Sequence, residues 1–413
     1  MKVLVIGSGG REHAVADSLS KSKRISELYC APGNGGISSI AECVDIKATD
    51  VDGICSFVQK KGIDFVVVTP DDPLMLGMVD RLEQLGVKAF GPRRNAAVIE
   101  GSKVFSKNLM KKYNIPTADF EVFDDYESAL KYVKSHGAPI VVKADGLALG
   151  KGVYVASTLD EAENALKEIM CDKKFGRSGS RVVIEECLSG REISVLAFTD
   201  GKTIKPMVSS QDHKRIYDGN KGPNTGGMGT YAPSPIYTNE LASECMERIY
   251  IPTIKAMANE GRPFKGVLYF GLMMTPKGIM VIEYNARFGD PETQVVLPLL
   301  ESDLFDIMEA VADEKLDKID IKWANKSAVC IIMASGGYPG KYETGFEIKG
   351  LEKAEKVFHA GTKKSGDKYL TGGGRVLGVV SVKDNMDEAI ESAYRDVSEI
   401  SFKNAYYRKD IGR

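Results

Sequence analysis

The sequence predicts a multidomain protein of mixed α/β and α+β class, with an amino-terminal doubly wound parallel sheet, a two-lobed central domain and a small carboxy-terminal α+β domain. A chain of 413 residues is too long for one ordinary hydrophobic core. Over residues 1–100, short apolar strands alternate with helical stretches, which is typical of a parallel sheet covered by helices. The sequence pattern changes near residues 100–104 and near Lys326, which suggests two domain boundaries. We therefore expect domains over residues 1–103, 104–326 and 327–413.

Composition excludes several classes of partner. The formal net charge of -2 gives no electrostatic reason to expect nucleic acid or an anionic membrane. The seven cysteines contain no Cys-x-x-Cys pair, which favours a reducing compartment. We find no signal peptide and no apolar run long enough to span a bilayer. We expect a cytoplasmic protein with small-molecule partners, either monomeric or a weak homo-oligomer.

A glycine loop, Gly7–Glu12, separates the first strand from the helix that follows it. The dinucleotide fingerprint has a third glycine where this chain has Glu12, and an acidic residue where the second strand here runs into Ala31-Pro32-Gly33. We therefore interpret the loop as a phosphate site formed by backbone N–H groups at a helix N-terminus, with Arg11 nearby. A tight turn without a ligand explains the loop equally well.

Residues 118–192 are predicted to form a small α/β lobe within the central domain. The strands Pro139–Lys143 and Val153–Ala156 flank a loop rich in glycine that contains Lys151. This loop is not a P-loop, because it lacks the required spacing and leads into a strand and not a helix. We interpret it as a lid over phosphates, with Lys143 and Lys151 as cations. The alternative is an exposed hairpin with solvated lysines.

The strand Val182–Leu188 is apolar and turns acidic at its end. A strand that leaves a sheet offers free backbone N–H and C=O groups, which suit an adenine edge. Glu192 would then accept hydrogen bonds from ribose hydroxyls. A simple sheet exit with surface glutamates is the alternative.

The polar segment Ser210–Ser234 has no predicted secondary structure. Loops of this length in compact domains are usually functional or disordered. This one mixes aromatic, charged and glycine residues, so we predict a substrate loop. The helix that follows, Asn239–Glu260, is expected to kink at Pro252.

The segment Val281–Gln294 is the part of the chain around which the site is predicted to form. It begins as a strand, so Glu283, Asn285 and Arg287 project from one face. The opposite face takes Ile282, Tyr284 and Ala286. A carboxylate with a neutral oxygen suits Mg²⁺, and an adjacent arginine suits phosphate or carboxylate. A half-exposed edge strand with polar residues facing water is the alternative.

The order of these motifs along the chain is more specific than any one of them. Lys143, the glycine and lysine lid, Glu185–Glu192 and Glu283-x-Asn285-x-Arg287 together resemble the ATP-grasp superfamily. Five further motifs look like those of the phosphoribosylamine–glycine ligase family: Arg11–Ala14, Gln211–Arg215, Asn224–Gly229, Arg287–Gln294 and Arg408–Gly412. The resemblance covers essentially the whole chain.

This resemblance implies an activity. Glycine attacks the γ-phosphate of ATP to give glycyl phosphate, and the amine of 5-phosphoribosylamine then displaces phosphate to give glycinamide ribonucleotide. Mg²⁺ or Mn²⁺ would be bound by Glu283 and Asn285. Catalytic roles would fall to Arg287, Lys143 and Asp212. The nucleotide would contact Lys103, Lys143, Gly150, Lys151, Gly152, Glu185, Glu186, Cys187, Leu188 and Glu192. The other substrates would contact Gly9, Gly10, Arg11, Glu12, Asp212, Lys214, Asn224, Thr225, Gly226, Arg287 and Asp290.

Two departures from the pattern and three rival functions stand beside this interpretation. Gly271 and its neighbours offer no second acidic metal ligand, and Thr69-Pro70-Asp71 replaces the Gly-Pro-Glu of the family, which leaves the role of Asp71 open. The rivals are an NAD-dependent oxidoreductase, a non-catalytic nucleotide-binding module and another ATP-grasp carboxylate–amine ligase. ADP release measured with each substrate omitted in turn would separate them.

Overall fold

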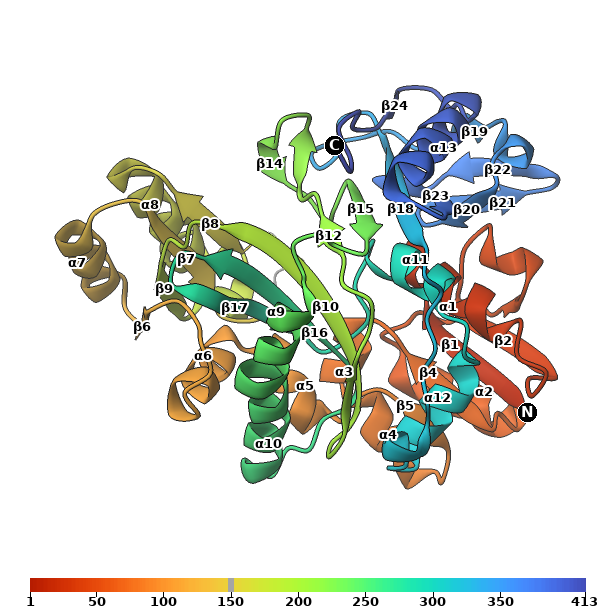
Figure 1. Ribbon diagram of the computed structural model, residues 1–413, viewed down its shortest axis with the longest axis horizontal. Helices are drawn as coiled ribbons and strands as arrows, with labels where there is room; N and C mark the ends of the chain where they lie inside the picture. The colour runs from red at the N-terminus through yellow and green to blue at the C-terminus, as the bar shows by residue number, and fades with distance from the viewer. Residues whose placement is uncertain (148–151) are drawn as a thin grey trace.

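A five-stranded parallel sheet forms the amino-terminal domain of the computed structural model, which describes residues 1–147 and 152–413 (Figure 1). The strand order is β3-β2-β1-β4-β5, and every neighbouring pair is parallel. This confirms the doubly wound parallel sheet. The strands are β1 (Lys2–Gly7), β2 (Glu27–Pro32), β3 (Glu42–Cys43), β4 (Phe65–Val68) and β5 (Lys88–Phe90). Helices α1 (Gly10–Leu19), α2 (Val51–Lys61) and α4 (Met78–Gln84) connect them.

Both faces of this sheet are buried, as its apolar sequence predicts. In β1, Leu4 and Ile6 belong to one hydrophobic cluster, while Val3 and Val5 belong to a second cluster on the other face. All four side chains are fully buried. Burial on both faces explains why β1 lacks the polar alternation of a half-exposed strand.

The helical stretch between β4 and β5 is divided in the structure. It forms two short helices, α3 (Asp71–Met75) and α4, separated by Gly77 at φ 83°. That left-handed conformation ends the first helix and is easily adopted only by glycine. A further helix, α5 (Arg94–Gly101), was not predicted. It leads directly into α6 (Lys103–Lys112). Ser102 caps α6, because its Oγ accepts a hydrogen bond of 3.1 Å from Phe105 N.

The central domain has two lobes, each built on an antiparallel sheet of four strands. The outer lobe lies at the left of Figure 1, with α7 (Tyr126–His136) and α8 (Leu159–Leu166) beside its sheet. Its strands, in spatial order, are β6 (Phe120–Phe123), β9 (Val182–Glu186), β7 (Ile140–Ala144) and β8 (Val153–Ala156). The inner sheet contains β11 (Ile204–Pro206), β10 (Arg191–Asp200), β16 (Lys265–Thr275) and β17 (Gly278–Asn285).

The long helix expected over Asn239–Glu260 changes its winding near Pro252. It consists of α9 (Asn239–Cys245), a π-helical turn, Met246–Tyr250, and α10 (Ile251–Asn259). Proline supplies no N–H to a helical hydrogen bond four residues back, which accounts for a widened turn just before it.

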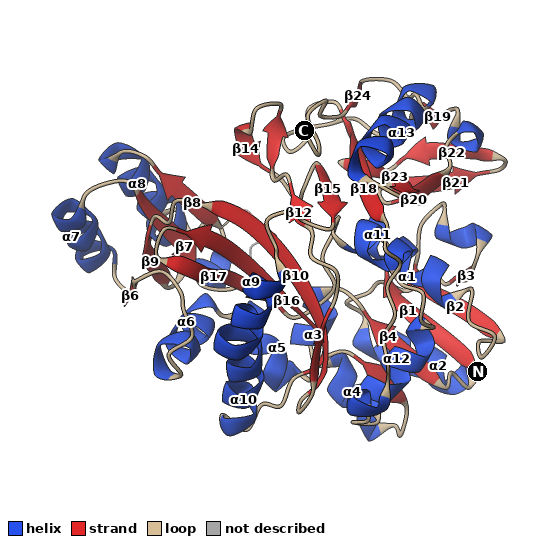
Figure 2. Cartoon of the chain, in the orientation of Figure 1, coloured by secondary structure: helices blue, strands red, loops and turns tan. Residues whose placement is uncertain are grey.

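The carboxy-terminal sheet includes strands from the middle of the chain. Its order is β12-β15-β18-β23-β20, and β24 also pairs with β18. Its strands are β12 (Gln211–Asp212), β15 (Gly229–Ala232), β18 (Ser327–Ser335), β23 (Arg375–Lys383), β20 (Lys356–His359) and β24 (Ala405–Tyr406). Helix α13 (Met386–Glu399) packs on this sheet, as Figure 2 shows. A small sheet beside it contains β19 (Glu347–Ile348), β22 (Lys368–Thr371) and β21 (Thr362–Ser365).

One prediction is corrected by this pairing. The segment Ser210–Ser234 is not an unstructured loop, because it contains β12, β15 and the hairpin of β13 (Arg215–Tyr217) and β14 (Lys221–Asn224). Through β12 and β15 the segment joins the carboxy-terminal sheet, while β13 and β14 pair with each other. The register partners of β15 lie far along the chain, for example Ile331 for Gly229, so no local pattern reveals them.

Two helices after the predicted site segment bring the domains together. Helices α11 (Thr293–Val296) and α12 (Leu304–Ala312) pack against α1, and α12 also contacts β5, β10 and β16. In Figure 1 both helices lie beside the amino-terminal sheet. The segment Val281–Gln294 is therefore placed where the three domains meet. No helix in the described ranges is long and apolar enough to cross a bilayer.

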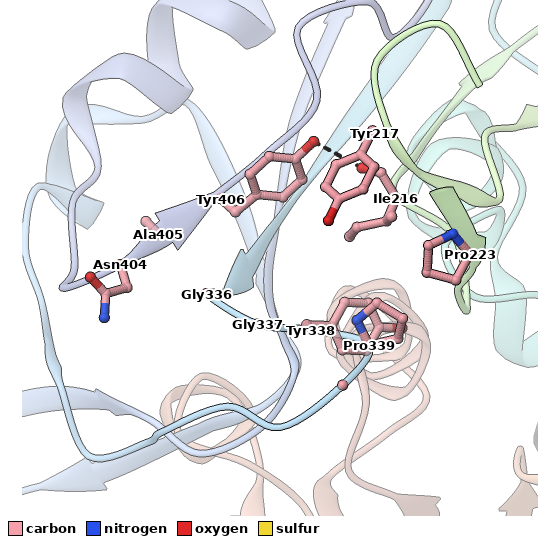
Figure 3. A pocket seen from close by; sticks show the side chains of 11 residues that line it. Ile216, Tyr217, Pro223, Gly336, Gly337, Tyr338, Pro339, Asn404, Ala405 and Tyr406 are labelled. Atoms are coloured by element: carbon pink, nitrogen blue, oxygen red, sulfur yellow. Dashed lines mark hydrogen bonds between the residues drawn. The ribbon is translucent and has the colours of Figure 1, made fainter. Parts of the chain in front are cut away.

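A cavity of about 420 Å³ lies between the β13–β14 hairpin and the loop that follows β18 (Figure 3). It is lined by Ile216, Tyr217, Pro223, Gly336, Gly337, Tyr338, Pro339, Gly340, Asn404, Ala405 and Tyr406. Across it, the hydroxyl of Tyr406 donates to the carbonyl of Ile216 at 2.9 Å. None of these residues belongs to the predicted site.

Candidate active site

The end of β17 brings Glu283, Asn285 and Arg287 together. Glu283 and Asn285 are half-buried and flank the buried Tyr284, as an alternating strand requires. Arg287 Nη2 donates to Asn285 Oδ1 at 3.1 Å. The strand is not perfectly regular. A bulge opposite Gly271 and Leu272 leaves Ile282 without a partner and only half-buried.

Four cations surround the carboxylate of Glu283. Burial alone would raise its pKa, but Lys214, Lys143, Lys103 and Arg287 together lower the pKa to about 2. The Lys214 ammonium is nearest, with Nζ 3.5 Å from Oε1. Glu283 is therefore ionised at neutral pH, and the positive charge around it exceeds its own negative charge. Such an arrangement suits a polyphosphate together with a divalent ion.

Lys143 is anchored by a buried carboxylate. Its Nζ lies 2.9 Å from Glu185 Oε2 and donates to the carbonyl of Ile282 at 3.2 Å. Lys107, which was not predicted as a site residue, lies 3.4 Å from the same Glu185 oxygen. Glu185 Oε2 is thus within ion-pair distance of both lysines. Any contact of Glu185 with adenine would have to use its backbone.

The other predicted nucleotide residues lie around the ends of these strands. Lys103 donates to the carbonyl of Gly146 at 3.1 Å, and burial lowers the pKa of this lysine, against the opposing effect of Glu283. Glu186 pairs with Lys277 at 2.7 Å. Glu192 is exposed near the start of β10. The half-buried pair that follows β9 is Cys187 and Leu188.

The predicted lid is described only at its base. Gly150 and Lys151 lie outside the described residues. Gly152 is buried, and its carbonyl accepts a hydrogen bond of 2.8 Å from the amide of Ala144. The strands on either side, β7 and β8, pair as the hairpin interpretation requires.

The first glycine loop is closed by Glu12. Its Oε2 accepts from Gly9 N at 2.6 Å, and its Oε1 accepts from Arg11 Nε at 2.5 Å. A side chain at Gly7 would meet Glu12, since a Cβ there would lie 2.5 Å from Glu12 Cγ. Glu12 therefore caps α1 and fixes Arg11, whose Nη1 reaches the carbonyl of Phe288 at 3.2 Å. This explains why a carboxylate replaces the third glycine of a dinucleotide site.

The substrate segment is held by its own backbone. The amide and the hydroxyl of Thr225 both donate to the carbonyl of Lys214, at 2.7 and 2.8 Å. Asn224 precedes this contact at the end of β14. Burial and the nearby Glu292 raise the pKa of Asp212 well above its usual range, although Lys214 and Arg375 oppose this.

Arg375 joins several parts of the site, although the sequence did not identify it as a site residue. Its Nη1 donates to the carbonyls of Gly226 at 2.8 Å and Asp290 at 2.9 Å, and its Nη2 lies 3.2 Å from Asp290 Oδ2. Burial raises the pKa of Asp290, but Arg375 and Arg11 outweigh it and lower the pKa overall. The glycine turn that precedes Arg375 was the available signal.

Glu292 and Tyr269 form a second unpredicted group beneath the site. The Tyr269 hydroxyl donates to Glu292 Oε1 at 3.1 Å and lies 2.8 Å from Ser194 Oγ. Gly10 is packed against the neighbouring Gln294, because a Cβ at Gly10 would lie 2.6 Å from Gln294 Nε2. The glycine loop of the first domain therefore contacts the segment that follows β17.

Comparison with known proteins was made on the whole chain. Family models for the N domain, the ATP-grasp (A) domain and the C domain of phosphoribosylglycinamide synthetase match residues 1–100, 101–293 and 328–413. A phosphoribosylamine–glycine ligase of Caldanaerobacter subterraneus subsp. tengcongensis is 49% identical over 413 residues, which cover 100% of this chain and 99% of that protein. One from Clostridium acetobutylicum is 48% identical over 414 residues, with 100% of both covered.

Solved structures show the same similarity. The crystal structure of a phosphoribosylamine–glycine ligase from Thermotoga maritima has a TM-score of 0.88 and 31% identity, with 100% of both chains covered. The biotin carboxylase domain of the Hydrogenobacter thermophilus 2-oxoglutarate carboxylase, solved with MgADP, has a TM-score of 0.74 and 17% identity, and covers 98% of this chain and 91% of that one. The second similarity shows a shared fold.

Proposed function

Because this chain belongs to the phosphoribosylglycinamide synthetase family, we propose that the side chains gathered at the end of β17 form its catalytic site. The chain is an ATP-dependent ligase that joins glycine to 5-phosphoribosylamine in purine biosynthesis, giving glycinamide ribonucleotide, ADP and phosphate. The observation that supports the placement of the site is the convergence of Lys214, Lys143, Lys103 and Arg287 on Glu283.

The chemistry needs activation of a carboxylate. The glycine carboxylate is a poor acyl donor, so its oxygen first attacks the γ-phosphorus of ATP, which breaks the bond to ADP. The amine of 5-phosphoribosylamine then attacks the carbonyl carbon of glycyl phosphate, and phosphate leaves with the bonding electron pair. The protein contributes position and charge, which are the main requirements of phosphoryl transfer.

The nucleotide would lie between the two lobes of the central domain. Lys143 and Lys103 would bind its phosphates. Lys151, in the proposed lid, would be a further cation for the phosphates. The backbone over residues 186–188 would meet adenine, and Glu192 the ribose. The burial of Glu185 supports this division, because its side chain holds Lys143 in place and is not directed to adenine.

A divalent ion fits the donor set at the end of β17. Glu283 offers an ionised carboxylate and Asn285 a neutral amide oxygen, which are hard ligands that Mg²⁺ and Mn²⁺ accept. Among residues 1–147 and 152–413, no cluster of three or more His, Cys, Asp or Glu is placed to hold a metal. The ion would therefore be held by these two residues together with phosphate oxygens and water. Its contribution is to neutralise charge on the phosphates.

The acceptor substrate would lie on the other side of Arg287. Arg287 would stabilise the transferring phosphate or the glycine carboxylate. Gly9, Gly10, Arg11 and Asp290 would surround 5-phosphoribosylamine, together with Lys214 and residues 224–226. Asp212, on β12, would have a catalytic role beside these residues.

The cellular setting follows from the cysteines. All seven are free thiols, and four of them, Cys30, Cys55, Cys245 and Cys330, are buried. This supports a reducing compartment, and we infer that the enzyme works in the cytoplasm. A monomer or a weak homo-oligomer is compatible with a site to which one chain contributes all the residues above.

ADP release tests the function and the site together. We expect release to require glycine and 5-phosphoribosylamine, and to be lost in Glu283→Ala while the melting temperature stays near that of the wild type. Glu391→Ala, an exposed position on α13, is the control and should retain full activity. Release without glycine, or near-normal turnover of Glu283→Ala at ordinary Mg²⁺, would contradict the proposal.

A further inference from the structure

Helix α5 carries a buried carboxylate to the back of the site. The helix lies between α3 and β17 and contacts both. Glu100 is in its last turn, and its side chain is only 8% exposed. A buried carboxylate needs hydrogen bonds and a counter-charge, because its desolvation is otherwise costly.

Both oxygens of Glu100 bind the segment that carries the site. Oε2 accepts a hydrogen bond of 2.7 Å from the amide of Ala286, and Oε1 lies 3.1 Å from Arg287 Nη2. The same guanidinium donates to Asn285 Oδ1 and to the carbonyl of Phe288, each at 3.1 Å. Arg287 is therefore held by a side chain from a different element as well as by its own strand.

We propose that Glu100 is a positioning residue of the ligase reaction, which fixes the end of β17 through the Ala286 amide and aims the Arg287 guanidinium through their ion pair. This inference depends on the proposed role of Arg287. It adds a residue from the first domain that touches no substrate and acts through Arg287.

The charges nearby explain why a second anchor is needed. Asp71, on α3, is close enough to Arg287 to raise its pKa, as Glu100 does. Without Glu100, the guanidinium would be free to turn toward Asp71. Glu100 opposes this with the shorter, directed contact.

The same connection places a phosphate-binding lysine. Gly101 follows Glu100 and packs so closely on α3 that a Cβ there would lie 2.4 Å from Met75 Cε. Ser102 then caps α6 and donates to Asp145 Oδ1 at 2.9 Å, and Lys103 is the next residue. Four consecutive residues thus link the Arg287 anchor to Lys103.

The test compares four proteins: wild type, Glu100→Gln, Arg287→Lys and the double variant. Glutamine keeps an oxygen for the Ala286 amide and removes the charge. We expect kcat/KM for glycine to fall by roughly 10- to 100-fold in Glu100→Gln, which is typical of a displaced catalytic group, with KM for ATP changed by less than about threefold. In the Arg287→Lys background, Glu100→Gln should cost less than about threefold more, because the interaction is already lost.

Glu83→Gln is the matched control. Glu83 lies in the same domain and pairs with Arg93 at 2.6 Å, but it is half-exposed and far from β17 in the sequence. Its kinetics should equal those of the wild type. Melting temperatures of all variants separate lost folding from lost positioning. If Glu100→Gln does not fold, Glu100→Asp replaces it, with a smaller loss expected because the charge remains.

Three results would overturn the inference. Unchanged kinetics of Glu100→Gln, with strongly impaired Arg287→Lys, would refute the role of Glu100 alone. Fully additive losses in the double variant would show that Glu100 does not act through Arg287. Wild-type activity of Arg287→Lys would refute the proposed role of Arg287 and the inference with it.

Discussion

Glu185→Gln removes the one negative charge between two buried lysines. Glu185 is 4% exposed, and its Oε2 lies 2.9 Å from Lys143 Nζ and 3.4 Å from Lys107 Nζ. Glutamine keeps the shape of the side chain. The ammonium groups of Lys143 and Lys107 would therefore remain close together without their common counter-ion.

The structure sets the size of the effect. Burial lowers the pKa of Lys107 to about 8, although Glu185 opposes this. At pH 7 the loss of Glu185 can cost at most about 1.4 kcal/mol through Lys107, because the lysine would release its proton beyond that point. The weakened charged hydrogen bond to Lys143 adds roughly 1.5–3 kcal/mol. We expect the free energy of unfolding to fall by about 3–4 kcal/mol at pH 7.

The dependence on pH has a definite sign. The folded pKa of Lys107 lies below its unfolded value, so the unfolded chain binds more protons between about pH 8 and 10.5, and the stability of the wild type rises with pH across that range. At pH 9 most Lys107 is already neutral in the folded wild type. The cost of Glu185→Gln should therefore be about 1 kcal/mol smaller at pH 9 than at pH 7.

Urea denaturation at pH 7 and pH 9 measures both quantities. Glu186→Gln is the matched control, because the neighbouring Glu186 is more exposed and pairs with Lys277 at the surface. We expect the control to change stability by less than about 1 kcal/mol at either pH. A cost below about 1 kcal/mol for Glu185→Gln at pH 7, or a cost that grows toward pH 9, would refute the reasoning.

Three further predictions concern other parts of the molecule. Glu283→Ala should lower kcat by more than about 100-fold with little change in melting temperature, because we assign Glu283 to the metal ion and its side chain is only half-buried. Burial lowers the pKa of His13 to about 4 and of His359 to about 3, so both stay neutral in the folded protein. Because only the unfolded chain then binds these protons, the free energy of unfolding should fall by about 2 kcal/mol for each histidine between pH 7 and pH 5. Thermal melts of His359→Gln and the wild type at the two pH values would measure this. In steady-state assays of Arg375→Gln, the fold-increase in KM for 5-phosphoribosylamine should be about ten times the fold-increase in KM for ATP, because the contact to Asp290 is lost.

Local patterns were sufficient for much of the fold. The buried parallel strands and the alternation around Tyr284 depend on neighbouring residues, so the sequence predicted them correctly. The expectation that Ser210–Ser234 lacks secondary structure was wrong, because some of its strand residues pair with residues about 100 positions away, such as Gly229 with Ile331. Such pairing depends on the whole fold and leaves no periodic signal in a short strand.

The site shows the same division. Glu283, Asn285 and Arg287 were predicted together because they share one strand. Arg375 and Glu100 were missed because they reach the site from other domains. Their partners include backbone groups, such as the Gly226 carbonyl and the Ala286 amide, that sequence spacing does not reveal. The roles of all the predicted site residues stay predictions until the variants are measured.

The charges of the site suggest that ATP binding is coupled to the placement of Arg287. Lys214, Lys143, Lys103 and Arg287 all act on Glu283, and Lys143 and Arg287 also pair with the buried carboxylates of Glu185 and Glu100. A polyphosphate that arrives with its metal ion would add further negative charge beside these cations. The phosphates of ATP would therefore be bound most tightly by the arrangement that also sets Arg287 for phosphate transfer. Because Glu100 fixes Arg287 from the first domain, this arrangement requires that the domains be correctly packed before chemistry begins.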